Sequence, residues 1–126
     1  MLADIHERLA GVTIEQLAFD TFVARYDRPG MLFYCDPPYF AGEDDYGAGV
    51  FHRDDFARLA GLARSARGKM VISINDRPEV REIFADLHQH AVETTYTLAK
   101  GNKALRAGEL IISNFASSDG AFLRAA

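Results

Sequence analysis

The most constraining feature of the chain is an apolar segment, Met31–Cys35, that ends abruptly in Asp36-Pro37-Pro38-Tyr39. The apolar run predicts a buried strand. Neither proline has an N–H group to donate to a sheet, and a residue before proline avoids helical angles, so the chain must leave the strand in a stiff, extended form. We therefore expect Asp36 and Tyr39 at the carboxyl end of a strand, where open α/β sheets bind ligands. Asp-Pro alone is also an ordinary end to a strand, but the second proline and the tyrosine favour a functional site.

The composition is that of one soluble globular domain. Of the 126 residues, 48% are apolar and 25% are charged, which excludes a chain that is disordered throughout. The formal net charge of −4 provides no overall attraction for nucleic acid, so contact with DNA must come from a local basic patch. The single cysteine, Cys35, cannot form an internal disulfide, and no leader or long apolar span is visible. We therefore expect a cytoplasmic protein without a membrane role.

Helical and strand-like patterns alternate along most of the chain, which predicts an α/β fold whose parallel strands are joined by crossover helices. The predicted helices contain the apolar positions of 19–26, 56–63 and 80–87, and the predicted strands are 31–35 and 70–74, with a further short strand at 11–15. Two later runs, 94–98 and 109–115, leave no room for a crossover helix between them and should pair antiparallel. Residues 40–50 lack either periodicity and are interpreted as a mobile loop beside the motif.

Two polar clusters outside the motif each allow two interpretations. Asn75 and Asp76 follow a predicted strand and could face the same crevice as Asp36, but a following proline makes them a good entry to a helix, which is the favoured interpretation. The basic residues of 100–106, which are Lys100, Lys103 and Arg106, either meet DNA phosphates or lie in a solvated turn.

Metal chemistry and cysteine chemistry are not supported by the pattern. The four histidines, which are His6, His52, His88 and His90, lack partners at metal-ligand spacing, so no metal site is predicted. Cys35 has no convincingly placed base beside it, and we expect it to pack within the sheet rather than to act as a nucleophile.

Taken together, these segments resemble the Dam-like adenine-specific DNA methyltransferases. The likeness runs from about His6 to Phe115, and it is carried by the motif at 36–39 together with Tyr26-Asp27, Gly68-Lys69, Ser73-Ile74-Asn75-Asp76, Pro78 to Glu82 and Glu109 to Phe115. The resemblance implies a partial Rossmann-like methyltransferase sheet with a terminal antiparallel hairpin. On this basis residues 1–115 form the carboxyl-terminal part of a catalytic domain, and residues 116–126 form a flexible tail. Restriction–modification is the setting that the resemblance implies.

The resemblance also implies the chemistry of the motif. In the family, the Asp36 carboxylate and the carbonyl of Pro37 accept the two amine hydrogens of an adenine flipped out of double-stranded DNA, and the Tyr39 ring stacks on the base beside Pro38. The methyl donor is S-adenosylmethionine, whose positive sulfonium is favoured near a carboxylate. Phe19 occupies the position of a ring that packs on the cofactor's adenine, and a core residue of the helix is the alternative interpretation of this aromatic. Ala18 stands where the family commonly has an acid, and the nearby Asp20 is out of register.

A second departure concerns what precedes these segments. The family's glycine-rich cofactor loop has no counterpart here, because Gly11 is isolated, and most of the target-recognition region is missing as well. The chain is therefore interpreted as the carboxyl-terminal half of a methyltransferase. Its half sheet would expose an apolar edge, so a complementary amino-terminal fragment is an expected partner. The alternative is an inactive remnant that binds no cofactor and serves at most as a binding module.

Overall fold

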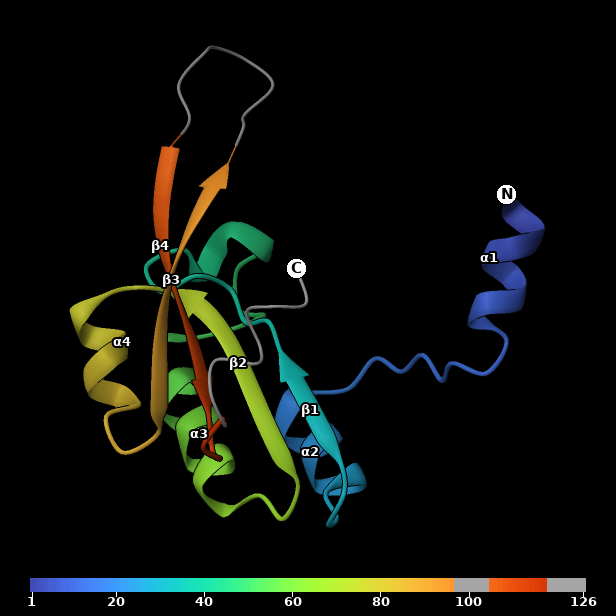
Figure 1. Ribbon diagram of the computed structural model, residues 1–126, viewed down its shortest axis with the longest axis horizontal. Coiled ribbons are helices and arrows are strands. Elements are labelled where there is room, and N and C mark those ends of the chain that lie inside the picture. Colours follow the sequence, from blue (N-terminus) through green and yellow to red (C-terminus); the bar gives the residue numbers. More distant parts are fainter. Residues whose placement is uncertain (97–104, 118–126) are drawn as a thin grey trace.

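A computed structural model describes residues 1–96 and 105–117 of the chain (Figure 1). In chain order, its elements are α1 (Leu2–Leu9), α2 (Phe19–Tyr26), β1 (Leu32–Cys35), the 3-10 turn η1 (Glu43–Tyr46), α3 (Arg53–Ser65), β2 (Lys69–Asn75), α4 (Pro78–Ile83), β3 (His88–Tyr96) and β4 (Leu105–Ser113). No helix within these residues is long and apolar enough to cross a membrane.

The four strands form one mixed sheet in the order β1-β2-β4-β3. β1 and β2 run parallel, with Leu32 opposite Lys69, and α3 makes the crossover between them. β4 is antiparallel to both of its neighbours, β2 and β3. The alternating α/β pattern and the antiparallel closing pair are therefore confirmed.

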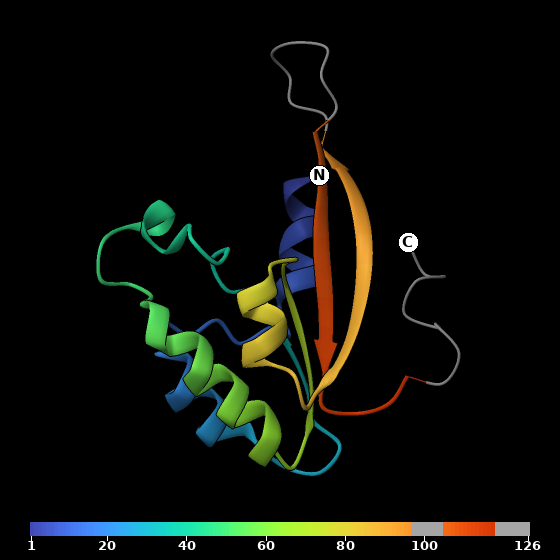
Figure 2. The same cartoon turned by 90° about the vertical axis from the view of Figure 1, so that its left-hand side faces the viewer.

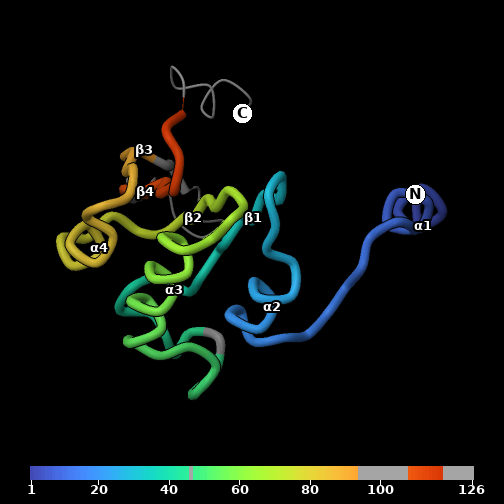
Figure 3. The backbone as a smooth tube through the Cα atoms, turned by 90° about the horizontal axis from the view of Figure 1, so that it is seen from below, coloured from blue at the N-terminus to red at the C-terminus, as the bar shows by residue number. Residues whose placement is uncertain are grey.

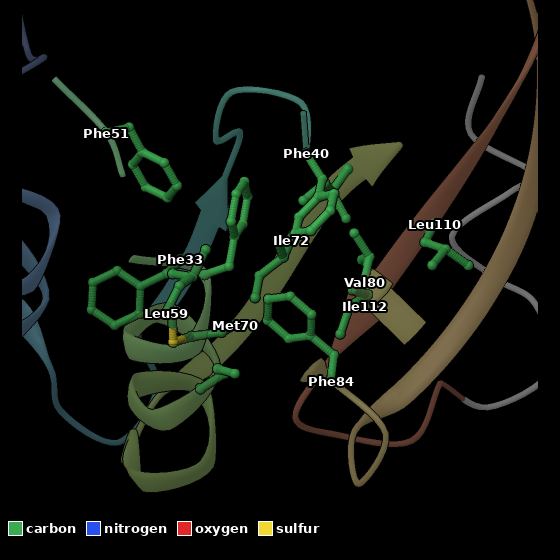
Figure 4. Packing of buried hydrophobic residues seen from close by; sticks show 14 of the residues in the cluster. Phe33, Phe40, Phe51, Leu59, Met70, Ile72, Val80, Phe84, Leu110 and Ile112 are labelled. Carbon is green, nitrogen blue, oxygen red and sulfur yellow. The ribbon is translucent and has the colours of Figure 1, made fainter. Parts of the chain in front are cut away.

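The helices α2, α3 and α4 lie on the same face of the sheet (Figure 2). Between these helices and the sheet is the hydrophobic core, whose largest fully buried side chains are Phe56, Phe84, Met70, Ile72, Ile74, Leu110, Ile112 and Val80. Figure 4 labels six of these side chains, Met70, Ile72, Val80, Phe84, Leu110 and Ile112, which belong to one packed cluster. The core therefore centres on β2, which has a partner on both sides.

The predicted helix at 19–26 and the strands at 31–35 and 70–74 are confirmed to within a residue or two. The predicted strand at 11–15 is wrong, because these residues form no regular structure and no strand lies beside them. Val12 and Ile14 are exposed there instead. A β-branched run becomes a strand only when another strand satisfies its backbone groups. The preceding residues form α1, which has no buried residue and stands apart from the sheet (Figure 3).

Helix α4 is shorter than the apolar spacing of residues 80–87 predicts. α4 ends at Ile83, and β3 begins at His88, six residues before the predicted start. The reason is Gln89, whose side-chain amide donates 2.9 Å hydrogen bonds to the carbonyls of Arg81 and Phe84. These bonds satisfy carbonyls that a helix end leaves unpaired, so the chain can turn directly into a strand.

Two side chains attach the strands to the helices. The Asp27 carboxylate accepts hydrogen bonds from the N–H groups of Arg67 at 2.9 Å and Gly68 at 2.8 Å, and these bonds lower its pKa. At the far end of β4, Asn114 accepts from the N–H of Met70 at 2.8 Å and donates to the carbonyls of Ala63 and Gly68. A Cβ at position 68 would lie 2.8 Å from the Met31 carbonyl, so only glycine fits this crossing.

Candidate functional site

The motif Asp36-Pro37-Pro38-Tyr39 leaves the sheet at the carboxyl end of β1, beside the carboxyl end of the parallel strand β2. Two buried phenylalanines flank it: Phe33 is 5% exposed and Phe40 is 6% exposed, and Figure 4 shows the loop that runs between them. Asp36 is exposed, whereas both prolines and Tyr39 are half-buried. Among the described residues, none makes a hydrogen bond or ion pair with the Asp36 carboxylate. The acid is therefore presented to solvent on a loop that is held at both ends.

Asn75 holds the carboxyl end of the motif rather than the start of the next helix. Its Oδ1 accepts from the N–H of Phe40 at 2.7 Å, and its Nδ2 donates to the carbonyl of Phe40 at 3.1 Å. The favoured interpretation of Asn75 and Asp76 as helix-capping residues is wrong, because α4 has Arg77 as its N-cap and no capping side-chain hydrogen bond. Asn75 instead binds the backbone that directly follows the motif.

Asp76 points to the other side and pairs with a helix residue. Its carboxylate accepts two 2.7 Å hydrogen bonds from the Arg81 guanidinium, which lower the pKa of Asp76. Its backbone N–H donates to the carbonyl of Gly108 at 2.9 Å. Asp76 therefore joins β4 to α4, and it takes no part in the site.

The hydroxyl of Tyr39 donates a hydrogen bond to the carboxylate of Glu109 on β4. Glu109 is the direct register partner of Asn75 across the β2–β4 pair, so one rung of the sheet supports two consecutive residues of the loop. Glu109 is not among the site residues expected from the sequence. A single acid at the start of an apolar strand carries no signal of this role until the strand register is known.

The loop after the motif is also packed against α3. The Phe40 ring lies 5.2 Å from the Phe56 ring, between centroids, and the Arg53 guanidinium carbon lies 4.0 Å from the Phe40 centroid. Arg53 also forms a 2.5 Å ion pair with Glu43, and this hydrogen bond lowers the pKa of Glu43. Residues 40–50 thus form a loop, as predicted, with the turn η1 inside it.

A pocket of about 660 Å³ opens beside β1, between α2 and residues 13–17. Asp36 lies on its wall, and six aromatic residues line it, which are Phe19, Phe22, Tyr26, Phe33, Tyr34 and Phe51. The structure therefore brings the two predicted cofactor-binding residues, Phe19 and Asp36, to one cavity. Its volume is typical of small-molecule sites, and so is an apolar lining with few polar groups.

Cys35 and Asp20 have packing and ion-pairing roles in the fold. Cys35 lines the pocket and is half-buried, and this burial raises the pKa of its thiol to about 11. The thiol stays protonated at neutral pH, which agrees with its predicted packing role. Asp20 is not part of the pocket wall, because its carboxylate pairs with Arg58 on α3 and also accepts from the N–H of Thr21 at 2.7 Å.

Other sequence candidates contribute nothing to this site in the described part of the chain. Among residues 1–96 and 105–117, no three histidine, cysteine or acidic side chains are grouped so as to hold a metal. Lys100 and Lys103 lie outside the described residues, as does the side chain of Arg106.

Comparison with known proteins identifies the family. No curated protein matches the chain significantly. The family model described as D12 class N6 adenine-specific DNA methyltransferase matches residues 2–98, a segment that contains α1 to β3 and the whole motif loop. The chain therefore belongs to the D12 class of N6 adenine-specific DNA methyltransferases.

Proposed function

We propose that this chain presents an adenine of double-stranded DNA for methylation of its 6-amino group, with S-adenosylmethionine as the methyl donor. The observation that carries the proposal is the exposed Asp36 carboxylate, which lies both on the wall of the pocket and at the start of the motif loop. One carboxylate can thus face a cofactor on one side and a base on the other. Family membership supports the general reaction.

The roles of the motif residues follow from the chemistry of an aromatic amine. Its lone pair is delocalised into the ring, so two acceptors must hold its hydrogens while the nitrogen approaches tetrahedral geometry. We assign these acceptors to the Asp36 carboxylate and the Pro37 carbonyl. Pro38 keeps the loop extended, and the Tyr39 ring offers a stacking surface to a flipped-out base, which offsets part of the few kcal/mol lost on unstacking.

The pocket beside β1 has the features that a sulfonium cofactor needs. Its volume of about 660 Å³ and its aromatic wall suit an adenosyl group, and Phe19 is the residue that we assign to packing on the cofactor's adenine. The Asp36 carboxylate would stabilise a positive charge beside it. When bound, S-adenosylmethionine supplies an activated methyl group. The chain's own contribution is to orient the amine in line with that methyl group and to exclude water.

Two measurements test the proposal. We expect saturable binding of S-adenosylmethionine by calorimetry, followed by methyl transfer to the adenines of duplex DNA. Asp36→Ala should abolish transfer without loss of folding, whereas Asp44→Asn, which changes an exposed acid of the loop, should leave it unchanged. A folded chain that binds no cofactor would contradict the assignment of the pocket, and full activity in Asp36→Ala would contradict the role of Asp36.

One observation favours a second function, binding of a partner. Within the described residues, β1 pairs with a strand on one side only, and its exposed residues Leu32 and Tyr34 are 58% and 67% accessible to solvent. We propose a complementary amino-terminal methyltransferase fragment as the partner at this edge. Co-expression with such a fragment should yield a stable complex and raise the affinity for S-adenosylmethionine. Cofactor binding by the chain alone, unchanged by the fragment, would exclude this requirement.

A further inference from the structure

The motif loop contains two prolines, which cannot donate backbone hydrogen bonds to a neighbouring strand. Pro37 and Pro38 have no N–H groups, so backbone hydrogen bonds from these positions cannot hold the loop to a neighbouring strand. Side chains from the neighbouring strands supply the attachment instead. Asn75 of β2 binds both polar groups of the Phe40 backbone, and Glu109 of β4 accepts the hydrogen bond of the Tyr39 hydroxyl.

We propose that Asn75 and Glu109 are positioning residues for the target base. They form one rung of the sheet, and together they fix the Tyr39 ring and the backbone after it before any nucleic acid binds. The proposal rests on the proposed function, in which the Tyr39 ring is the surface on which the base stacks. Neither residue needs to touch the base.

The energetic reason is preorganisation. A side chain that is ordered only on binding weakens the affinity for the ligand, by about five-fold for a typical side chain. A tyrosine ring is attached at Cβ and carries its hydroxyl at the far end, so a hydrogen bond at the hydroxyl fixes both ends of the ring. With the Glu109 bond in place, the ring is already ordered when the protein folds, so the binding free energy of a stacked base does not include this ordering cost.

Asn75 has the chemistry that its position requires. Its side chain uses its acceptor and its donor on the same residue, and an amide carries the two on separate atoms that can bond to one backbone unit at the same time. An aspartate would keep the acceptor for the Phe40 N–H but would turn a carboxylate oxygen toward the Phe40 carbonyl. Because the Phe40 ring is itself buried, the carboxyl end of the loop cannot shift to relieve this repulsion. We therefore expect Asn75→Asp to loosen the loop as much as Asn75→Ala does.

The kinetic test separates positioning from chemistry. In methyl transfer to duplex DNA, Glu109→Ala and Tyr39→Phe should each raise KM for DNA by about five-fold, the equivalent of one ordered side chain, with kcat within about two-fold. Glu109→Gln keeps an acceptor oxygen and should restore the wild-type KM. The double variant Glu109→Ala/Tyr39→Phe should be no worse than either single variant, because both remove the same bond. An unchanged KM in Glu109→Ala, or additive effects, would overturn the proposal.

A second test does not depend on activity, so it distinguishes failure of this proposal from failure of the proposed function. Nuclear magnetic relaxation of the labelled Tyr39 ring in the free protein should report increased ring motion in Glu109→Ala, with recovery in Glu109→Gln. Exchange of the Phe40 amide hydrogen should accelerate in Asn75→Ala and in Asn75→Asp. Glu82→Gln, which changes an exposed acid on α4, is the matched control and should alter neither signal. An equally rigid ring in Glu109→Ala would overturn the proposal, whether or not the wild-type chain transfers methyl groups.

Discussion

The two edges of the sheet differ in length, polarity and what covers them. β3 is nine residues long, its residues His88, His90 and Glu93 are exposed, and it pairs with β4 along its whole length. β1 has four residues, exposes two large apolar side chains, and borders a pocket lined by aromatic rings. Polar and charged side chains protect an edge strand from unwanted pairing, whereas an exposed apolar edge favours contact. The polar edge is thus suited to solvent, and the β1 edge is suited to a ligand or a partner.

The largest effect is expected from replacing a core phenylalanine, and a phenylalanine beside β1 provides the comparison. Phe84, under β2 and the hairpin, is 0% exposed, whereas Phe22, at the pocket beside β1, is 39% exposed. Phe84→Ala should lower the free energy of unfolding by about 3–5 kcal/mol, because it leaves a cavity in a closed core. Phe22→Ala should cost less than about 1.5 kcal/mol. Urea denaturation of both variants measures the difference, and equal costs would mean that the β1 side is covered in solution.

The reactivity of the Cys35 thiol measures how well the pocket beside β1 is shielded from water. With a pKa of about 11, Cys35 has far less thiolate at pH 8 than an ordinary cysteine. Alkylation by iodoacetamide should therefore be about a hundred-fold slower than for the same chain in denaturant. Mass spectrometry over time provides the rates. Comparable rates in the two states would show that water enters the pocket freely and that burial does not control the thiol.

The pH dependence of stability tests the hydrogen bonds by which Asp27, just before β1, holds the start of β2. The hydrogen bonds from the N–H groups of Arg67 and Gly68 lower the folded-state pKa of Asp27, so its contribution to stability is complete above the ordinary aspartate pKa. That contribution is lost as the pH falls through the lowered folded-state value. Unfolding free energies of wild type and Asp27→Asn, measured between pH 2 and 7, should therefore converge on acidification. If the difference in unfolding free energy between the two proteins did not change with pH, the hydrogen bonds to Asp27 would not lower its pKa in the folded state.

The smallest effect on stability is expected from charges placed on the two edges. Tyr34→Lys on β1 and His90→Lys on β3 replace exposed side chains and should each change the unfolding free energy by less than about 0.5 kcal/mol. Their association should differ, however. Sedimentation at increasing concentration should show less self-association for Tyr34→Lys than for wild type and no change for His90→Lys. The contrast between the edges is refuted if both lysines act alike.

Local patterns were sufficient to predict most of the elements in the described part of the chain. The apolar spacing predicted α2 and α3, and the apolar runs predicted β1 and β2, because each of these elements carries its own periodicity. The antiparallel closing pair was also predicted, since its connection is too short for a crossover. The strand expected at 11–15 and the length of α4 were wrong for one shared reason: a missing neighbouring strand and the Gln89 side chain are tertiary facts that no local pattern contains.

The candidate site divides in the same way. Asp36-Pro37-Pro38-Tyr39 was identified from sequence, because two prolines and an acid after an apolar strand restrict the backbone wherever they occur. Asn75 was assigned the wrong role, and Glu109 was missed. Their roles depend on which residues of β2 and β4 lie opposite each other, and a shift of one residue would turn both side chains to the other face of the sheet.

Proline geometry and apolar periodicity act over a few residues, so the amino-acid sequence was enough to place a stiff acidic loop after a strand and to reveal the resemblance to adenine-specific DNA methyltransferases. The burial expected for that strand was wrong, because β1 is an edge strand in which only Phe33 is fully buried. Phe19 and Asp36 meet at one pocket, and Asn75 and Glu109 hold the motif loop, only because the complete sheet and its helices are assembled. Among the strands that the structure describes, this assembly also leaves one edge of β1 unpaired. These contacts join residues as much as 70 positions apart, and their existence depends on strand order and register, which arise only when the whole sheet is assembled.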